Sequence, residues 1–327
     1  MALALPLIDV GPLLRPDADH LAVARLIDDA CRQFGFFRIT GHGIPAGQLA
    51  ELERLARRFF AEPEGLKVEI AMARGGPAWR GWFPLDGELT SGRPDHKEGV
   101  YFGTELPPEH PAVVAGRPLH GPNLFPASVP DLRPAVLGWI DAMVDLGAAL
   151  LRAVALGLGL PAGWFAHHVT SEPTVLFRIF RYPPDPETAQ WGVAEHTDYG
   201  LLTILATDDH DGLQVHAPTG WIDVPSDPGV FVVNLGDMLD RMTEGRYRST
   251  PHRVRNTSGT ERLSFPCFID PSWDAACPVL PLAGSPPADD AARRWDGRSV
   301  RAWDGTYGEY LTAKVAKVFP AIRHQLG

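Results

Sequence analysis

The chain has 327 residues, of which 45% are hydrophobic and 21% are charged, as in an ordinary globular protein with a substantial core. Its formal net charge is −10 and it contains no long basic run, so we expect neither nucleic acid nor an anionic membrane surface as a partner. Cys31, Cys267 and Cys277 form no CxxC pair and indicate no disulfide framework.

The N-terminal residues resemble neither a signal peptide nor a membrane anchor. They carry no basic leader, and their apolar run stops at Asp9. Elsewhere no stretch approaches about 18 consecutive apolar residues, the length that a membrane-spanning helix needs. We therefore expect a cytoplasmic protein that does not span a membrane.

The first 60 residues alternate between strand and helix patterns. Residues 5–10 predict a short strand, and apolar positions at helical spacing predict a helix from His20 to Phe34. A strand from Phe36 to Ile39 follows, and a second helix is predicted from Ala46 to Phe60. These helices are expected to pack on a sheet.

The middle of the chain is irregular. Residues 75–135 are rich in glycine and proline, which is typical of long functional loops. The aromatic residues within this segment fit either a packed surface loop or the rim of an active site. A long helix is then predicted from Pro134 to Leu158, behind the sheet.

From Thr174 onward, short β-rich runs are separated by turn residues, a pattern typical of a sandwich or barrel. A helical turn from Asp237 to Met242 interrupts them, and a closing helix is predicted from Thr306 to Phe319. The predicted strands cover residues 175–182, 202–207, 213–216, 221–224, 230–234, 252–254 and 262–269.

A candidate metal site lies among these strands. His196 and Asp198 are two residues apart, so on an extended segment their side chains leave from the same face. His252 offers a third ligand from a later strand. Two histidines and a carboxylate on one face of an octahedral ion leave the opposite face open, as in non-haem Fe(II) oxygenases. An HxD triplet alone also fits an ordinary surface turn.

A second polar cluster supports the metal site. Arg262 and Ser264 share one face of a predicted buried strand with Pro266 and Phe268. A buried guanidinium beside a hydroxyl needs an anionic partner, because an unpaired buried charge is costly. The far carboxylate of 2-oxoglutarate is such a partner.

The sequence resembles the Fe(II)/2-oxoglutarate-dependent oxygenases of the isopenicillin N synthase-like group, over nearly its whole length. The motifs that carry the resemblance are residues 35–44, 95–98, 181–184, 195–200, 233–237 and 307–311. The resemblance implies an α+β fold with a mainly β core, a double-stranded β-helix (jelly roll) flanked by N-terminal and C-terminal helices. Residues 1–120 would form an N-terminal region of helices and strands, and residues 121–327 the jelly-roll core with its helical layer, together one structural unit.

The resemblance also implies a reaction. Fe(II) would be held by His196, Asp198 and His252, and 2-oxoglutarate and O2 would complete its coordination, with ascorbate as a candidate reductant. Arg262, Ser264 and Tyr182 would bind the C5 carboxylate of 2-oxoglutarate. The expected activity is oxidation of a small molecule, foremost hydroxylation, with release of succinate and CO2, by a monomer or weak homodimer.

Substrate contacts are predicted less sharply. Phe268 shares the strand face of Ser264 and is the first candidate for the pocket wall; the others are Phe180, Arg80, Tyr101 and Trp82. Aromatic walls suit an apolar or ring-bearing molecule, whereas Arg80 or Arg178 could hold a carboxylate. Many relatives have asparagine where this chain has Phe180, so a polar contact from that position is in doubt.

Four alternatives stay open at this point. An isopenicillin N synthase-like oxidase would use the same iron without 2-oxoglutarate, and an ethylene-forming enzyme would decompose 2-oxoglutarate itself. A non-catalytic ligand sensor would have no reason to keep three metal ligands with Arg262 and Ser264. A Zn or Ni isomerase on the same fold would use more histidines and lack the anion-binding pair.

Overall fold

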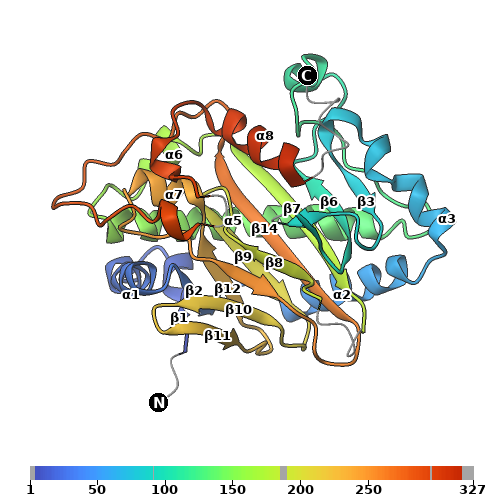
Figure 1. Cartoon of the computed structure of the whole chain (residues 1–327), viewed down its shortest axis with the longest axis horizontal. Helices are drawn as coiled ribbons and strands as arrows, with labels where there is room; N and C mark the ends of the chain where they lie inside the picture. Colours follow the sequence, from blue (N-terminus) through green and yellow to red (C-terminus); the bar gives the residue numbers. More distant parts are fainter. Residues whose placement is uncertain (1–3, 91, 185–189, 295–296, 319–327) are drawn as a thin grey trace.

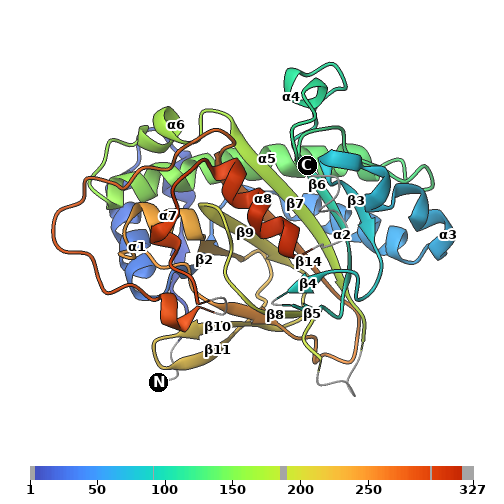
Figure 2. The same ribbon diagram turned by 45° about the horizontal axis from the view of Figure 1, so that its top comes forward.

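The computed structural model describes residues 4–90, 92–184, 190–294 and 297–318 of the chain. Two β-sheets form its centre, and the longest helices cover the outer side of the larger sheet (Figure 1). Turning the molecule shows the smaller sheet on the other side, with a C-terminal helix crossing near the open end between the sheets (Figure 2).

The larger sheet has eight strands in the order β1-β2-β12-β9-β14-β7-β6-β3. All neighbouring strands are antiparallel except β1 and β2, which are parallel. The strands are β1 (Leu7–Asp9), β2 (Phe36–Thr40), β3 (Gly81–Phe83), β6 (Glu98–Gly103), β7 (Pro173–Tyr182), β9 (Leu202–Thr207), β12 (Phe231–Leu235) and β14 (Arg262–Ser272).

The smaller sheet has four antiparallel strands in the order β11-β10-β13-β8. They are β8 (Val193–His196), β10 (Leu213–Ala217), β11 (Gly220–Val224) and β13 (His252–Val254), and a separate two-stranded hairpin consists of β4 (Leu89–Thr90) and β5 (Arg93–Pro94). Two mainly antiparallel sheets whose inner faces share one cavity are what the predicted jelly roll requires.

Helices α1, α2 and α5 form the outer layer (Figure 1). Helix α1 starts at His20 because the carboxylate of Asp19 accepts the free backbone N–H groups of Leu21 and Ala22. The helices are α1 (His20–Gln33), α2 (Ala46–Phe60), α3 (Glu64–Lys67), α4 (Pro111–Val114), α5 (Leu132–Gly157), α6 (Trp164–His168), α7 (Asp237–Met242) and α8 (Tyr307–Val318).

Helix α5 is the one helix in the described residues that is long and apolar enough to cross a membrane by length and composition. Half of its most apolar window is buried, and the helix contacts α1, α2 and strands β7, β9 and β14. Trp139, Met143 and Leu150 are fully buried in this layer. The core helix of a globular fold passes the same length and composition test, so α5 gives only weak evidence for a membrane span.

Most of the longer elements lie where the sequence predicted them, but several shorter ones were not predicted, among them helices α3, α4 and α6 and the β4–β5 hairpin. The irregular segment 75–135 contains β3 and β6, which extend the larger sheet at one edge, and the short strand β8 was not predicted as a separate strand. The first 120 residues thus supply strands to both edges of a sheet whose centre comes from the later part of the chain. The predicted end of the closing helix, Phe319, lies outside the described residues.

Candidate active site

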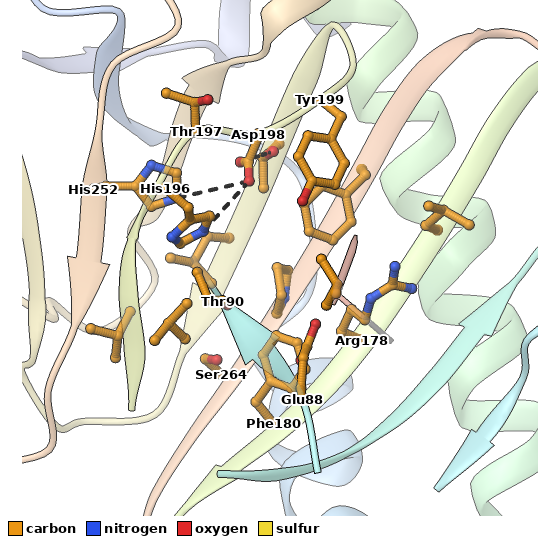
Figure 3. Close-up of a pocket in the computed structure, with 18 of the residues that line it drawn as sticks. Glu88, Thr90, Arg178, Phe180, His196, Thr197, Asp198, Tyr199, His252 and Ser264 are labelled. Atoms are coloured by element: carbon orange, nitrogen blue, oxygen red, sulfur yellow. Dashed lines mark hydrogen bonds and ion pairs between the residues drawn. The ribbon is translucent and has the colours of Figure 1, made fainter. Parts of the chain in front are cut away.

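His196, Asp198 and His252 converge at one end of the cavity between the sheets (Figure 3). The pairing of β8 with β13 sets His196 directly opposite His252, and the two ring centroids are 4.2 Å apart. Asp198 follows two residues after β8, and its Oδ1 lies 3.8 Å from the Nε2 atom of each histidine. The sheet register therefore brings residues from two distant parts of the chain to one point.

Hydrogen bonds to the backbone orient both imidazoles. Nδ1 of His196 lies 2.8 Å from the carbonyl oxygen of Ala194, and Nδ1 of His252 lies 3.2 Å from that of Thr250. If each Nδ1 donates its proton, each Nε2 keeps a free lone pair that faces Asp198. Burial, and then the neighbouring His196, lower the pKa of His252 to about 4, so its ring is neutral at physiological pH.

The carboxylate of Asp198 is held by one oxygen only. Thr203 and Asn234, from β9 and β12, donate hydrogen bonds of 2.5 and 2.7 Å to its Oδ2. Oδ1 is left to face the two histidines. Asn234, near the end of β12, thus positions the candidate metal ligand Asp198 through its side-chain amide.

The three ligand atoms lie close together, and the two separations between Asp198 and the histidines fit a single metal ion. They all lie within 4.8 Å of one another. Two atoms bound to one ion at about 2.1 Å can be at most about 4.2 Å apart. The two separations of 3.8 Å satisfy this limit. Two imidazole nitrogens and one carboxylate oxygen, with Nδ1 and Oδ2 already engaged elsewhere, are a donor set suited to Fe(II).

Arg262, Ser264 and Tyr182 form a second cluster in the same cavity. Strands β14 and β7 pair so that Arg262 lies opposite Tyr182, with the guanidinium 5.0 Å from the phenol ring centroid. The hydroxyls of Tyr182 and Ser264 are 3.2 Å apart. Burial raises the pKa of Tyr182, so its hydroxyl stays protonated and can donate.

The guanidinium of Arg262 has a free donor. Its Nε donates to the carbonyl oxygen of His210 at 3.1 Å, but the buried Nη1 has no hydrogen-bond partner. A buried guanidinium N–H without an acceptor is costly. A carboxylate placed among Arg262, Ser264 and Tyr182 would satisfy it, so this end of the cavity fits one end of a dicarboxylate such as 2-oxoglutarate.

The predicted substrate-contact residues do not all line the cavity. Phe268, Phe180, Tyr101 and Arg178 do line it. They lie on the inner face of β14, β7 and β6.

Arg80 and Trp82 are placed elsewhere, which corrects their assignment to the substrate pocket. The guanidinium of Arg80 is buried beneath Gly103 and donates to the carbonyl oxygen of Leu119 at 2.9 Å, and its burial lowers its pKa to about 9. The indole of Trp82 donates to Glu98 at 2.9 Å. Both residues tie strands to neighbouring segments instead of facing the cavity.

Sequence reasoning missed several residues of the cavity wall. Lys97 lies in the wall with its ammonium 4.7 Å from the ring centroid of Phe180, and it forms ion pairs with Asp95 and Glu88. Helix α8 closes one side through Leu311 and Lys314. Lys97 and Leu311 belong to motifs that carry the family resemblance, but no local spacing places them in the cavity wall, because they reach it only through the packing of distant elements.

Comparison with known proteins gives matches over most of the chain. Residues 5–128 match a family model described as "non-haem dioxygenase in morphine synthesis N-terminal", and residues 173–271 match the "2OG-Fe(II) oxygenase superfamily". The second match contains all three candidate metal ligands and the Arg262 cluster.

Curated relatives and solved structures agree with these matches. A probable iron/ascorbate oxidoreductase of Dictyostelium discoideum is 42% identical, covering 98% of this chain and 96% of its own. A 1-aminocyclopropane-1-carboxylate oxidase of the same organism is 32% identical, with 97% and 95% covered. The crystal structure of a full-length Neurospora crassa protein in complex with α-ketoglutarate (2-oxoglutarate) superposes with a TM-score of 0.77 at 26% identity, covering 95% and 96%.

Proposed function

The chain belongs to the 2OG-Fe(II) oxygenase superfamily, and from this premise we propose which of its residues carry out the reaction. It is an Fe(II)- and 2-oxoglutarate-dependent oxygenase that oxidises a small molecule. In our proposal His196, Asp198 and His252 hold the iron, and Arg262, Ser264 and Tyr182 hold 2-oxoglutarate. One observation carries the proposal: a preformed metal-binding triad and an unsatisfied buried guanidinium share one cavity.

The iron, when bound, supplies the activation of O2 that is coupled to decarboxylation of 2-oxoglutarate to succinate and CO2. The protein's residues then have to bind, orient and shield the reactants. His196, Asp198 and His252, at one end of the cavity, would hold the ion and leave it accessible to ligands from the cavity. Thr203 and Asn234 keep the carboxylate of Asp198 in one orientation.

The co-substrate contacts follow from hydrogen-bonding capacity. Arg262 offers its free Nη1, and the hydroxyls of Ser264 and Tyr182 can both turn toward the same carboxylate. A planar guanidinium with two flanking hydroxyls selects a carboxylate by charge and geometry together. The other end of the molecule, its 2-oxo acid group, would then be available to the metal held by His196, Asp198 and His252, which line the same cavity.

A second candidate function is an oxidase that takes all its electrons from the substrate and does not use 2-oxoglutarate. The similarity to a 1-aminocyclopropane-1-carboxylate oxidase is the observation that favours this candidate. The free donor of Arg262 would then bind a carboxylate of another molecule. An enzyme activity that decomposes 2-oxoglutarate to ethylene is the third candidate function.

Three measurements distinguish these functions. Anaerobic addition of Fe(II) and then 2-oxoglutarate should produce a visible metal-to-ligand absorption band, and its absence would contradict the assigned binding residues. With substrate present, one succinate per O2 consumed supports the oxygenase, and O2 uptake without succinate supports the oxidase. Headspace analysis for ethylene tests the third candidate.

A further inference from the structure

We propose that the substrate carries an anionic group, foremost a carboxylate, that pairs with Arg178, and an apolar body that lies against Tyr101 and Phe268. This inference rests on the proposed function, since it concerns the substrate end of the same cavity. It assigns to Arg178 a role in substrate selection that is separate from the binding of iron and of 2-oxoglutarate.

Arg178 shares a strand face with the co-substrate cluster. On β7, residues 178, 180 and 182 leave from the same face of the strand, and all three line the cavity. Tyr182 lies opposite Arg262, whereas Arg178 lies opposite Tyr101 of β6. Four residues along a strand separate Tyr182 from Arg178 by about 13 Å. In Figure 3 the Arg178 guanidinium lies across the cavity from the triad.

The guanidinium of Arg178 is buried without a partner. The residue is 8% exposed, and its Nη1 is fully enclosed with no hydrogen-bond partner. Within the described residues the side chain of Arg178 makes no hydrogen bond, and no carboxylate oxygen lies within 4.0 Å of its nitrogens. Arginine stays charged in proteins, so the structure holds an uncompensated cation at the cavity wall.

Neighbouring carboxylates are already engaged by other groups. Glu88 accepts a short hydrogen bond from the hydroxyl of Tyr101 and pairs with Lys97 at 3.0 Å. Asp95 pairs with the same ammonium. Asp270 accepts from Tyr307 through Oδ2 at 2.5 Å; its buried Oδ1 has no hydrogen-bond partner among the described residues, but it lies more than 4.0 Å from the nitrogens of Arg178. In the described residues no carboxylate thus lies close enough to form an ion pair with Arg178, and a ligand can supply that partner.

Aromatic rings hold the guanidinium in place. Its central carbon lies 3.4 Å from the ring centroid of Tyr101 and 5.4 Å from that of Phe268. Stacking on a ring face leaves the N–H edge of a guanidinium free for a two-pronged hydrogen bond to a carboxylate. The same two rings offer apolar surface to the part of the substrate next to its carboxylate.

Matched pairs of small molecules test the proposal. Wild-type enzyme with Fe(II) and 2-oxoglutarate, kept anaerobic, is titrated with aromatic and aliphatic carboxylates and with their primary amides, beginning with phenylacetate and phenylacetamide. The shift of the metal-to-ligand absorption band reports binding near the iron. We expect some acids to bind about 10- to 100-fold tighter than their amides, as loss of one charge-assisted hydrogen bond implies.

Variants connect this preference to Arg178. In Arg178→Gln the acid and the amide should bind equally, while the Kd for 2-oxoglutarate stays within about twofold of wild type. Arg178→Lys keeps the charge but loses the planar fork, so it should keep part of the preference. Arg80→Gln is the matched control: it removes a buried arginine outside the cavity and should leave the acid preference intact even where it lowers the melting temperature.

Three results would overturn the proposal: no acid preferred over its amide in wild type, an acid preference that survives in folded Arg178→Gln, or a loss of 2-oxoglutarate affinity in that variant. If Arg178→Gln fails to fold, Arg178→Lys decides, and an unchanged preference there counts against the pairing. Failure of the proposed function itself appears earlier, as a missing absorption band before any acid is added.

Discussion

The two carboxylate oxygens of Asp198 have different partners, and this difference determines how much Fe(II) affinity each nearby substitution is expected to remove. Oδ2 is held by Thr203 and Asn234, and Oδ1 faces the histidines. Asn234→Ala should weaken Fe(II) binding about 10- to 100-fold, as is typical when a partner of a ligand is lost. Asp198→Ala should weaken it further and abolish turnover. Calorimetric Fe(II) titration with a melting curve checks both, and iron-loaded, active Asp198→Ala would refute the triad.

Arg262 is expected to act through geometry as well as charge. Its Nε already binds the carbonyl oxygen of His210, so the free Nη1 points from a fixed guanidinium. Arg262→Lys keeps the positive charge and loses this planar arrangement. We expect the 2-oxoglutarate concentration for half-maximal activity to rise about 10- to 100-fold. An unchanged requirement would make Arg262 structural and favour the oxidase.

At the scale of single residues, the spacing of residues along a strand predicted which side chains lie together in the cavity better than residue type did. Two-residue spacing predicted that His196 and Asp198 lie together and that Arg262, Ser264 and Phe268 share a face, and the structure has both arrangements. The same spacing on β7 extends from Tyr182 to Arg178. Arg80 fits no such pattern, because the backbone around it turns: Trp79 has a positive φ of 56°.

At the scale of elements, one loop joins the metal-binding residues to helix α7. The backbone N–H of Asp237, the first residue of α7, donates to the carbonyl oxygen of Asp198 at 2.7 Å, and that of Met238 donates to Gly200 at 3.0 Å. A Cβ on Gly200 would lie 1.5 Å from Oδ1 of Asp270. Only glycine allows the loop to approach β14 this closely.

Gly200→Ala should therefore disturb the site through the loop. Overpacking of this kind costs about 1–3 kcal/mol of unfolding free energy, and displacement of Asp198 should weaken Fe(II) binding in parallel. Gly138→Ala, in helix α5, is the control, since its nearest neighbour, Nε2 of Gln48, is 4.0 Å away. It should raise stability by about 0.5–1 kcal/mol. Equal melting temperatures for the two variants would contradict this explanation.

Elements with strong periodicity were predicted almost to the residue, and short ones were not. Helix α2 spans Ala46–Phe60 as its apolar spacing indicated. Strand β8 has four residues, with an exposed Glu195, and becomes a strand only by pairing with β13. Strand β6 is buried throughout but lies in a glycine-rich segment. Tertiary pairing, which a single sequence does not contain, decides both cases.

For the whole molecule, the jelly-roll fold and the oxygenase family predicted from the sequence motifs are confirmed by the matches to known proteins. Composition alone indicated only that the chain forms a globular protein. The division of the chain at residue 120, the cytoplasmic location and the monomeric or weakly dimeric state stay predictions. A shared eight-stranded sheet favours one structural unit over two.

The stability of the whole fold should depend on pH through Asp270. Burial raises the pKa of this carboxyl to about 7, against 3.8 for the ordinary group. Below pH 4 both folded and unfolded chains are protonated there, and the group contributes no difference. As the pH rises toward 7, the unfolded chain ionises freely while the folded chain resists, so folding loses up to about 4 kcal/mol. Above pH 7 the loss is constant.

Asp270→Asn removes this ionisation and keeps an acceptor for the hydroxyl of Tyr307. The unfolding free energy of the variant relative to wild type should therefore rise between pH 4 and pH 7 and stay level above that range. Urea unfolding at several pH values, with a chelator present so that iron binding does not contribute, measures this difference. Burial also raises the pKa of Asp240 to about 7, but this residue is present in both proteins, so its contribution to the pH dependence cancels in the comparison. A difference that does not change with pH would mean that Asp270 is ionised in the fold, and that its hydrogen bonds outweigh its burial.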